Sequence, residues 1–159
     1  MRWFSFFILA YVTLGVQVGL SGYATLGNAR PNFVLIVAVF VAMNAPRDAA
    51  LLGCFLLGLA QDLLTPSPFG LFALEYALLG MFVTTTQDLL YREHFLTHMT
   101  LGFVGALLTG LITLIHGWIY PLFHGGVKVS RASIGTMITG AFYTALLAPI
   151  LLFVLQRMR

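Results

Sequence analysis

Five side chains that can form strong hydrogen bonds or ionise lie within the apolar stretches of this sequence. They are Gln17, Gln61, Asp62, Glu75 and His116. A carboxylic acid within an apolar helix can transfer a proton, contact a ligand or a partner, or form a buried hydrogen bond. Because an ionised acid in hydrocarbon is costly, each of these residues is expected to have a structural or functional task.

The two acids each allow two interpretations. Asp62 ends an apolar stretch and precedes a turn rich in Pro and Gly, so it is either a cap at a helix end or an organising group of an outer surface or cavity. Glu75 lies within the next apolar stretch. It is either a buried structural acid or a contact for a ligand or partner. The sequence leaves both pairs of alternatives open.

Other reactive residue types give no catalytic or metal-binding pattern. His94 and His98 have the four-residue spacing of a metal pair, but they lie at a membrane boundary where polar side chains are ordinary. The lone Cys54 has no activating base nearby in the sequence. There is no nucleophile elbow, His-Glu-x-x-His motif or phosphate loop. We therefore predict a protein that is not an enzyme and uses no cofactor, with a small membrane enzyme as an alternative.

The composition indicates an integral membrane protein. Of the 159 residues, 60% are hydrophobic and 8% are charged, and the mean hydropathy is +0.96. Apolar stretches fill nearly the whole length and leave no part for a soluble domain. We predict one all-α, polytopic helix bundle that forms a single integral membrane domain over residues 1–159. The net charge of +3 is not a nucleic-acid surface.

The apolar stretches predict six membrane-spanning helices. The predicted ranges are 3–22, 30–45, 48–65, 68–90, 96–120 and 133–155. In the second range, Pro31 suits a first helical turn and Pro46 stops the helix, which leaves about 15 residues, or ~22 Å of rise. Because a bilayer core is about 30 Å thick, five spans remain an alternative. The first range is longer than the apolar part of a signal peptide, so we expect it to be retained.

Three further expectations concern connections and orientation. Residues 121–132 are expected to form the longest external loop, and Pro149 is expected to kink the last helix. The distribution of Lys and Arg favours a cytoplasmic N-terminus and C-terminus. In that orientation Arg2, Arg47, Arg92, Arg157 and Arg159 are cytoplasmic, and Arg30, Lys128 and Arg131 are external.

Small residues recur at helical spacing, which lets helix backbones approach closely within a bilayer. The stripes are Gly15 and Gly19; Ala50, Cys54, Gly58 and Asp62; Ala73, Ala77, Gly80 and Thr84; and Gly102, Ala106 and Gly110. We interpret them as internal packing faces, with docking of another protein as the alternative. Glu75 points away from the stripe on its own helix, so that helix is expected to have protein or water on two sides.

Motifs over residues 28–90 resemble those of the rod shape-determining protein MreD family. They are Arg30-Pro31-Asn32 before the second helix, Gly58-Leu-Ala-Gln-Asp62 at the end of the third, and Pro68-Phe-Gly70 before the fourth. Asn32 stands where the family often has an acid. The motif residues are Arg30, Pro31, Asn32, Gly58, Asp62, Pro68 and Gly70, and they are our candidates for partner binding.

The resemblance implies a scaffold subunit of the bacterial cell-elongation complex in the cytoplasmic (inner) membrane. Relatives bind the single-span protein MreC and act with a RodA-type glycan polymerase, a class B penicillin-binding transpeptidase and, indirectly, MreB filaments. The family is also similar in fold to substrate-binding subunits of energy-coupling-factor transporters. That similarity supplies an alternative function, a vitamin-binding transport subunit in which Gln17, Asp62, Glu75 and His116 line a pocket.

Overall fold

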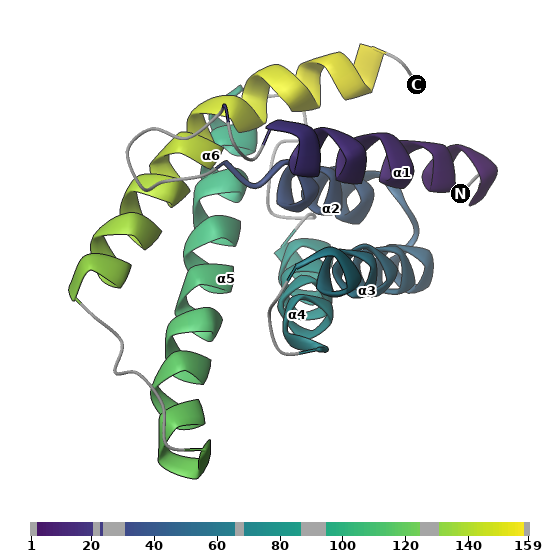
Figure 1. Cartoon of the computed structure of the whole chain (residues 1–159). Helices are drawn as coiled ribbons and strands as arrows, with labels where there is room; N and C mark the ends of the chain where they lie inside the picture. Colours follow the sequence, from purple (N-terminus) through teal and green to yellow (C-terminus); the bar gives the residue numbers. More distant parts are fainter. Residues whose placement is uncertain are drawn as a thin grey trace.

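The computed structural model describes residues 3–20, 23, 31–65, 69–86, 95–124 and 131–157, and these form six α-helices with no strand among them. The helices are α1 (Trp3–Leu20), α2 (Phe33–Asn44), α3 (Arg47–Leu64), α4 (Leu71–Thr86), α5 (Phe95–His124) and α6 (Arg131–Arg157). Figure 1 shows α5 and α6 side by side as a long pair, next to the group formed by α1 to α4. The predicted all-α class and number of helices are confirmed.

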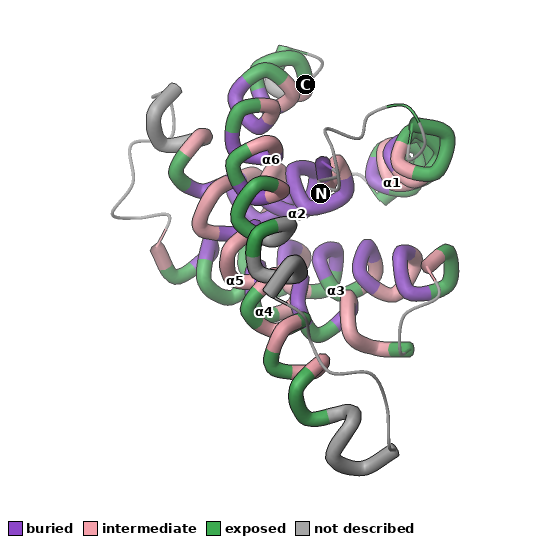
Figure 2. The backbone as a smooth tube through the Cα atoms, turned by 60° about the vertical axis from the view of Figure 1, so that its left-hand side comes forward, coloured by how far each residue is buried: buried purple, intermediate pink, exposed green. Residues whose placement is uncertain are grey.

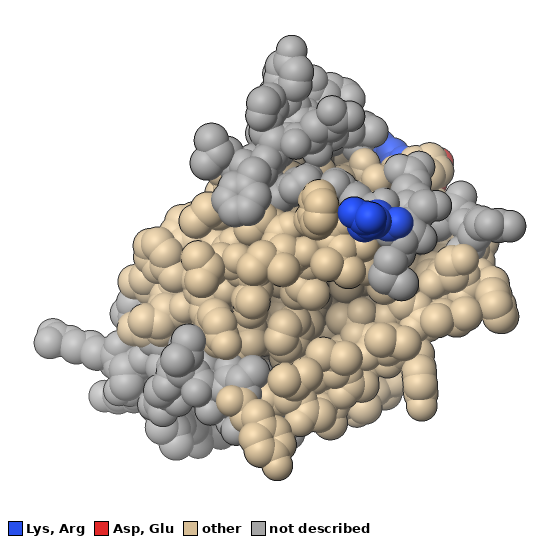
Figure 3. Space-filling view, turned by 90° about the horizontal axis from the view of Figure 1, so that it is seen from above, with Lys and Arg blue, Asp and Glu red and all other residues tan. Residues whose placement is uncertain are grey.

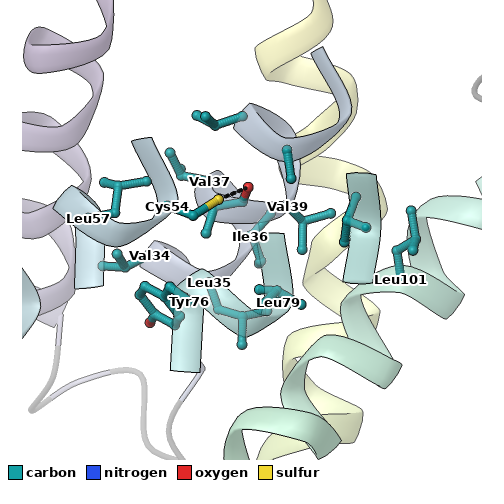
Figure 4. Packing of buried hydrophobic residues seen from close by; sticks show 14 of the residues in the cluster. Val34, Leu35, Ile36, Val37, Val39, Cys54, Leu57, Tyr76, Leu79 and Leu101 are labelled. Atoms are coloured by element: carbon teal, nitrogen blue, oxygen red, sulfur yellow. Dashed lines mark hydrogen bonds between the residues drawn. The ribbon is translucent and has the colours of Figure 1, made fainter. Parts of the chain in front are cut away.

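Helix α2 occupies the centre of this arrangement and contacts every other helix. Nearly all its residues from Val34 to Met43 are fully or almost fully buried, whereas most of α1 is exposed (Figure 2). Its side chains meet those of α3, α4 and α5 in one hydrophobic cluster, and the Cys54 thiol donates a hydrogen bond to the Ala38 carbonyl there (Figure 4). A helix that is apolar all round is suited to such a buried position.

The start of α2 differs from the predicted one. Pro31 was expected in the first helical turn, but the helix begins at Phe33 because Asn32 is its N-cap. The Asn32 side chain accepts a hydrogen bond of 3.0 Å from the Leu35 backbone N–H. The resulting 12-residue helix rises only about 18 Å, so α2 is shorter than the predicted second span.

Within the described ranges, three helical segments are long and apolar enough to cross a membrane. They are α1, Met99–Ile119 within α5 and Ile138–Leu155 within α6. Helices α2 and α4 are shorter apolar helices, and α3 carries charged residues near both ends. Helix α5 also continues through Pro121 to His124, so the connection predicted to start at 121 begins later. Pro149 lies within α6, whose ribbon changes direction along its length in Figure 1.

The small-residue stripes of α3 and α4 pack against each other. A Cβ atom added at Gly58 would overlap the Phe72 carbonyl oxygen and would lie 2.6 Å from the Ala73 Cα. Gly80 approaches Cys54 in the same way, and Gly102 of α5 approaches Ala148 of α6. The internal-packing interpretation therefore holds for these stripes. Gly15 and Gly19 of α1, in contrast, have no neighbour within 4 Å of an added Cβ.

The Gly58 contact predicts a large difference between two matched Gly→Ala variants. Gly58→Ala is expected to destabilise the protein by about 1–3 kcal/mol, because backbone atoms of α4 cannot move aside easily. Gly15→Ala adds the same methyl group to open space, so it is expected to be neutral or to stabilise α1 by up to ~1 kcal/mol. Thermal unfolding in detergent measures both, and equal melting temperatures would contradict the close α3–α4 contact.

Candidate functional site

Two of the predicted polar residues, Gln17 and Gln61, connect to the start of α2, Gln17 directly and Gln61 through Tyr76. Gln17 of α1 donates from Nε2 to the Pro31 carbonyl at 3.2 Å and accepts at Oε1 from the Phe33 N–H at 2.8 Å. The backbone N–H of Asn32 donates to Thr144 Oγ1 of α6 at 3.3 Å. Side chains from α1 and α6 thus satisfy backbone groups that lie before the helical hydrogen-bonding pattern of α2 begins.

Tyr76 of α4 connects this segment to α3. Its hydroxyl lies 2.9 Å from Asn32 Nδ2 and 2.6 Å from Gln61 Oε1. One hydroxyl proton suffices, because Asn32 donates to the tyrosine oxygen while Tyr76 donates to Gln61. Tyr76 has no exposed surface, so this network joins α2, α3 and α4 in the interior. Such a fully connected network fixes the relative positions of its helices.

Asp62 caps the start of α4. Its Oδ2 accepts hydrogen bonds from the N–H groups of Gly70 and Ala73, at 3.1 and 3.0 Å, and its Oδ1 accepts from Phe72 at 3.0 Å. Free N–H groups and the helix dipole both favour a carboxylate there. Gly70 has a φ of 95°, a backbone conformation that glycine adopts without strain. Of the two interpretations left open for Asp62, the structure shows the helix cap.

Glu75 lies on the side of α4 that meets α5, away from the small-residue side that packs against α3. Its side chain is completely buried, and Oε1 forms a hydrogen bond of 2.6 Å with the hydroxyl of Thr113. Its other oxygen, Oε2, has no hydrogen-bond partner within the described part of the chain. Helix α4 therefore has protein on two sides, as the direction of Glu75 relative to the small-residue stripe predicted.

Of the remaining predicted residues, some are described by the structure and others lie outside the described ranges. Gly58 lies in the α3–α4 contact, and His116 is half-buried on α5. Arg30 and Pro68 lie outside the described residues. So do Arg2, Arg92, His94, Lys128 and Arg159, and the side chains of His98 and Arg131.

Three residues of the polar network were not anticipated. They are Tyr76, Thr113 and Thr144, which contribute hydroxyl groups from α4, α5 and α6. A Tyr directly after a membrane-embedded Glu was a usable signal, because a buried phenol needs a hydrogen-bond partner. The two threonines carried no such signal, since a Thr hydroxyl in a helix can bond to its own backbone.

The arrangement is suited to holding helices together and offers little for catalysis. Gln17, Asn32, Gln61, Asp62 and Tyr76 all have partners within the chain. Within the described ranges, no group of three or more His, Cys, Asp and Glu side chains could hold a metal ion. The network is therefore a structural centre of the bundle, formed around the start of α2.

Removing one hydroxyl group from this network should have a measurable cost. Tyr76→Phe leaves Gln61 Oε1 and Asn32 Nδ2 without a partner in the interior, so we expect a loss of about 1–3 kcal/mol. Tyr11→Phe is the matched control, because Tyr11 is 81% exposed and should change stability little. Thermal unfolding in detergent compares the two, and equal effects would show that the network contributes nothing.

The cap predicts a second asymmetry, between two Asp→Asn variants. Asp62→Asn replaces a carboxylate that accepts three backbone hydrogen bonds, so it should cost about 1–3 kcal/mol. Asp48→Asn changes an exposed acid in the first turn of α3 and should cost less than ~1 kcal/mol. Chemical or thermal unfolding followed by circular dichroism checks this. A variant Asp62→Asn as stable as Asp48→Asn would exclude the capping role.

Comparison with known proteins supplies the family. A family model described as rod shape-determining protein MreD matches residues 1–158, essentially the whole chain. No curated protein and no solved structure gives a significant match. The family is named for a role in cell shape, not for a catalysed reaction, and the apolar helices agree with a membrane protein. The chain belongs to the MreD family of rod shape-determining proteins, and its role is in determining rod shape within the rod-shape complex.

Proposed function

We propose that the chain is a non-enzymatic scaffold subunit of the cell-elongation complex in the bacterial inner membrane. It binds an MreC-like single-span protein and so helps to couple peptidoglycan synthesis to MreB. A RodA-type glycan polymerase and a class B penicillin-binding transpeptidase are the expected further partners. Membership of the MreD family supports the assembly, and the internal use of the polar residues supports binding without chemistry.

The observation that carries the proposal is the contrast between interior and surface. The polar side chains around the start of α2 bond to one another and to the backbone, whereas α1, α5 and α6 present large apolar side chains outward. On the face shown in Figure 3 the described surface is almost entirely uncharged, with Arg side chains in small areas. Such apolar helix faces suit lipid or a partner's membrane helix. The proposed docking therefore uses apolar surface.

The motif residues contribute to this function mainly from inside. Asn32, Gly58, Asp62 and Gly70 fix α2, α3 and α4 relative to one another, so they shape the surface that a partner meets. The proposed orientation has both termini in the cytoplasm. The exposed positions of Arg47 and of Arg157 at the end of α6 are compatible with that orientation.

Mass spectrometry of a mild-detergent pull-down of the tagged protein from its native membranes tests the proposal. We expect an MreC-like single-span protein and wall synthases, absent from an untagged control, and we expect no stoichiometric small molecule. We expect no bound small molecule because the side chains of Gln17 and Asp62, which would line its pocket, form hydrogen bonds within the chain. Recovery of transporter ATPases or of a bound vitamin in the same sample would replace the scaffold by the transport function.

A further inference from the structure

The buried carboxyl group of Glu75 has a hydrogen-bond environment that does not suit an ionised acid. Among the described residues its hydrogen-bond partner is the Thr113 hydroxyl, at Oε1, and Oε2 has none. A carboxylate in an apolar interior normally needs a cation or several N–H or O–H donors. The Asp62 carboxylate has three backbone N–H donors. The Glu75 carboxyl group has no comparable set of donors among the described residues.

The helices around Glu75 place no Lys or Arg near its carboxyl group. Neither α2, α4 nor α5 contains a Lys or Arg, and α3 has only Arg47, in its first turn. The titratable groups whose charges act on Glu75 are Asp62 of α3, whose negative charge opposes a second one, and Tyr76 of α4 itself. His116 of α5 lies about one turn beyond Thr113. Helix α2 has no titratable side chain.

The contacts of Thr113 show where a proton would go. Its Oγ1 lies 2.6 Å from Glu75 Oε1 and 3.1 Å from the Thr109 carbonyl oxygen, but a hydroxyl group has only one proton to donate. If Glu75 carries a proton on Oε1, it donates to Thr113, and Thr113 donates to Thr109. Both short contacts are then hydrogen bonds, and only an uncharged carbonyl oxygen, Oε2, remains unpaired.

We propose that Glu75 is a proton-binding site, and that the bound proton holds α5 against α4 through Thr113. Loss of the proton leaves a negative charge without a cation or a second donor. Its hydration then requires α5 to move away from α4. Little movement is needed, because Thr113 itself is exposed at the edge of this contact. The site goes beyond the scaffold function, which does not require a titrating group.

Infrared spectroscopy of the purified full-length protein detects the proton directly. At neutral pH we expect the carbonyl stretch of a protonated carboxylic acid, lost in Glu75→Gln and retained in the matched variant Asp48→Asn, which changes an exposed acid. Thr113→Val should shift this band because its hydrogen bond is gone, and Thr113→Ser should restore it. Absence of the band from the wild-type protein at neutral pH would overturn the proposal, whatever the variants do.

The pH dependence of stability gives an independent test. In the proposed state the folded protein holds a proton that the unfolded chain releases. The melting temperature of the wild type should therefore fall as pH rises from the range in which a free glutamic acid ionises to the range in which Glu75 loses its proton. Glu75→Gln should remove this part of the slope, whereas Asp48→Asn should keep it. If Glu75 had only a structural role, Glu75→Gln would lower the melting temperature equally at every pH and leave its slope against pH unchanged. That result would contradict proton binding.

Distances between spin labels test the movement. Labels at Met81→Cys on α4 and Ile115→Cys on α5, both exposed positions, are placed in a Cys54→Ala background. We expect longer and broader distances as pH rises in the otherwise wild-type protein, and unchanged distances when Glu75→Gln is added. Equal distances at all pH values in both would show that the proton does not control the α4–α5 contact.

Discussion

The structure depends on how a buried chain segment satisfies its backbone hydrogen bonds inside an apolar protein. Helix α2 is only 12 residues long and central, so its first N–H groups lie in the interior. No water is available in hydrocarbon to meet them, and each unpaired group is costly. Asn32, Gln17 and Thr144 meet this need from α2, α1 and α6. The other helices are therefore arranged around the start of α2.

The same constraint explains the acid at the end of α3. Helix α4 also begins within the bundle, and Asp62 supplies the acceptors for its first N–H groups. This cap and the close approach at Gly58 fasten α3 to α4, while Tyr76 fastens both to α2. The described motif residues Asn32, Gly58, Asp62 and Gly70 thus form internal connections between helices.

The sequence predicted the all-α class, six helices, the packing role of the small residues on α3, α4 and α5, and the direction of Glu75 away from the small-residue stripe of α4. The stripe of Gly15 and Gly19 on α1 has no such packing partner. It misplaced the start of α2, because Pro31 fits a first turn as well as the residue before a cap, and only the Asn32 side-chain bond decides. It also missed Thr113 and Thr144, since periodicity does not say which helices are neighbours. Tertiary contacts between distant segments decide which polar groups meet.

Hydrogen exchange of the α2 backbone, measured by mass spectrometry on the protein in lipid nanodiscs, tests the central claim most directly. If α2 is excluded from water and fully hydrogen-bonded, the amides of Phe33–Asn44 should exchange among the slowest in the chain, including those of the first turn. Fast exchange confined to that first turn would contradict the account. It would mean that water reaches the polar residues, as in a solute-binding pocket.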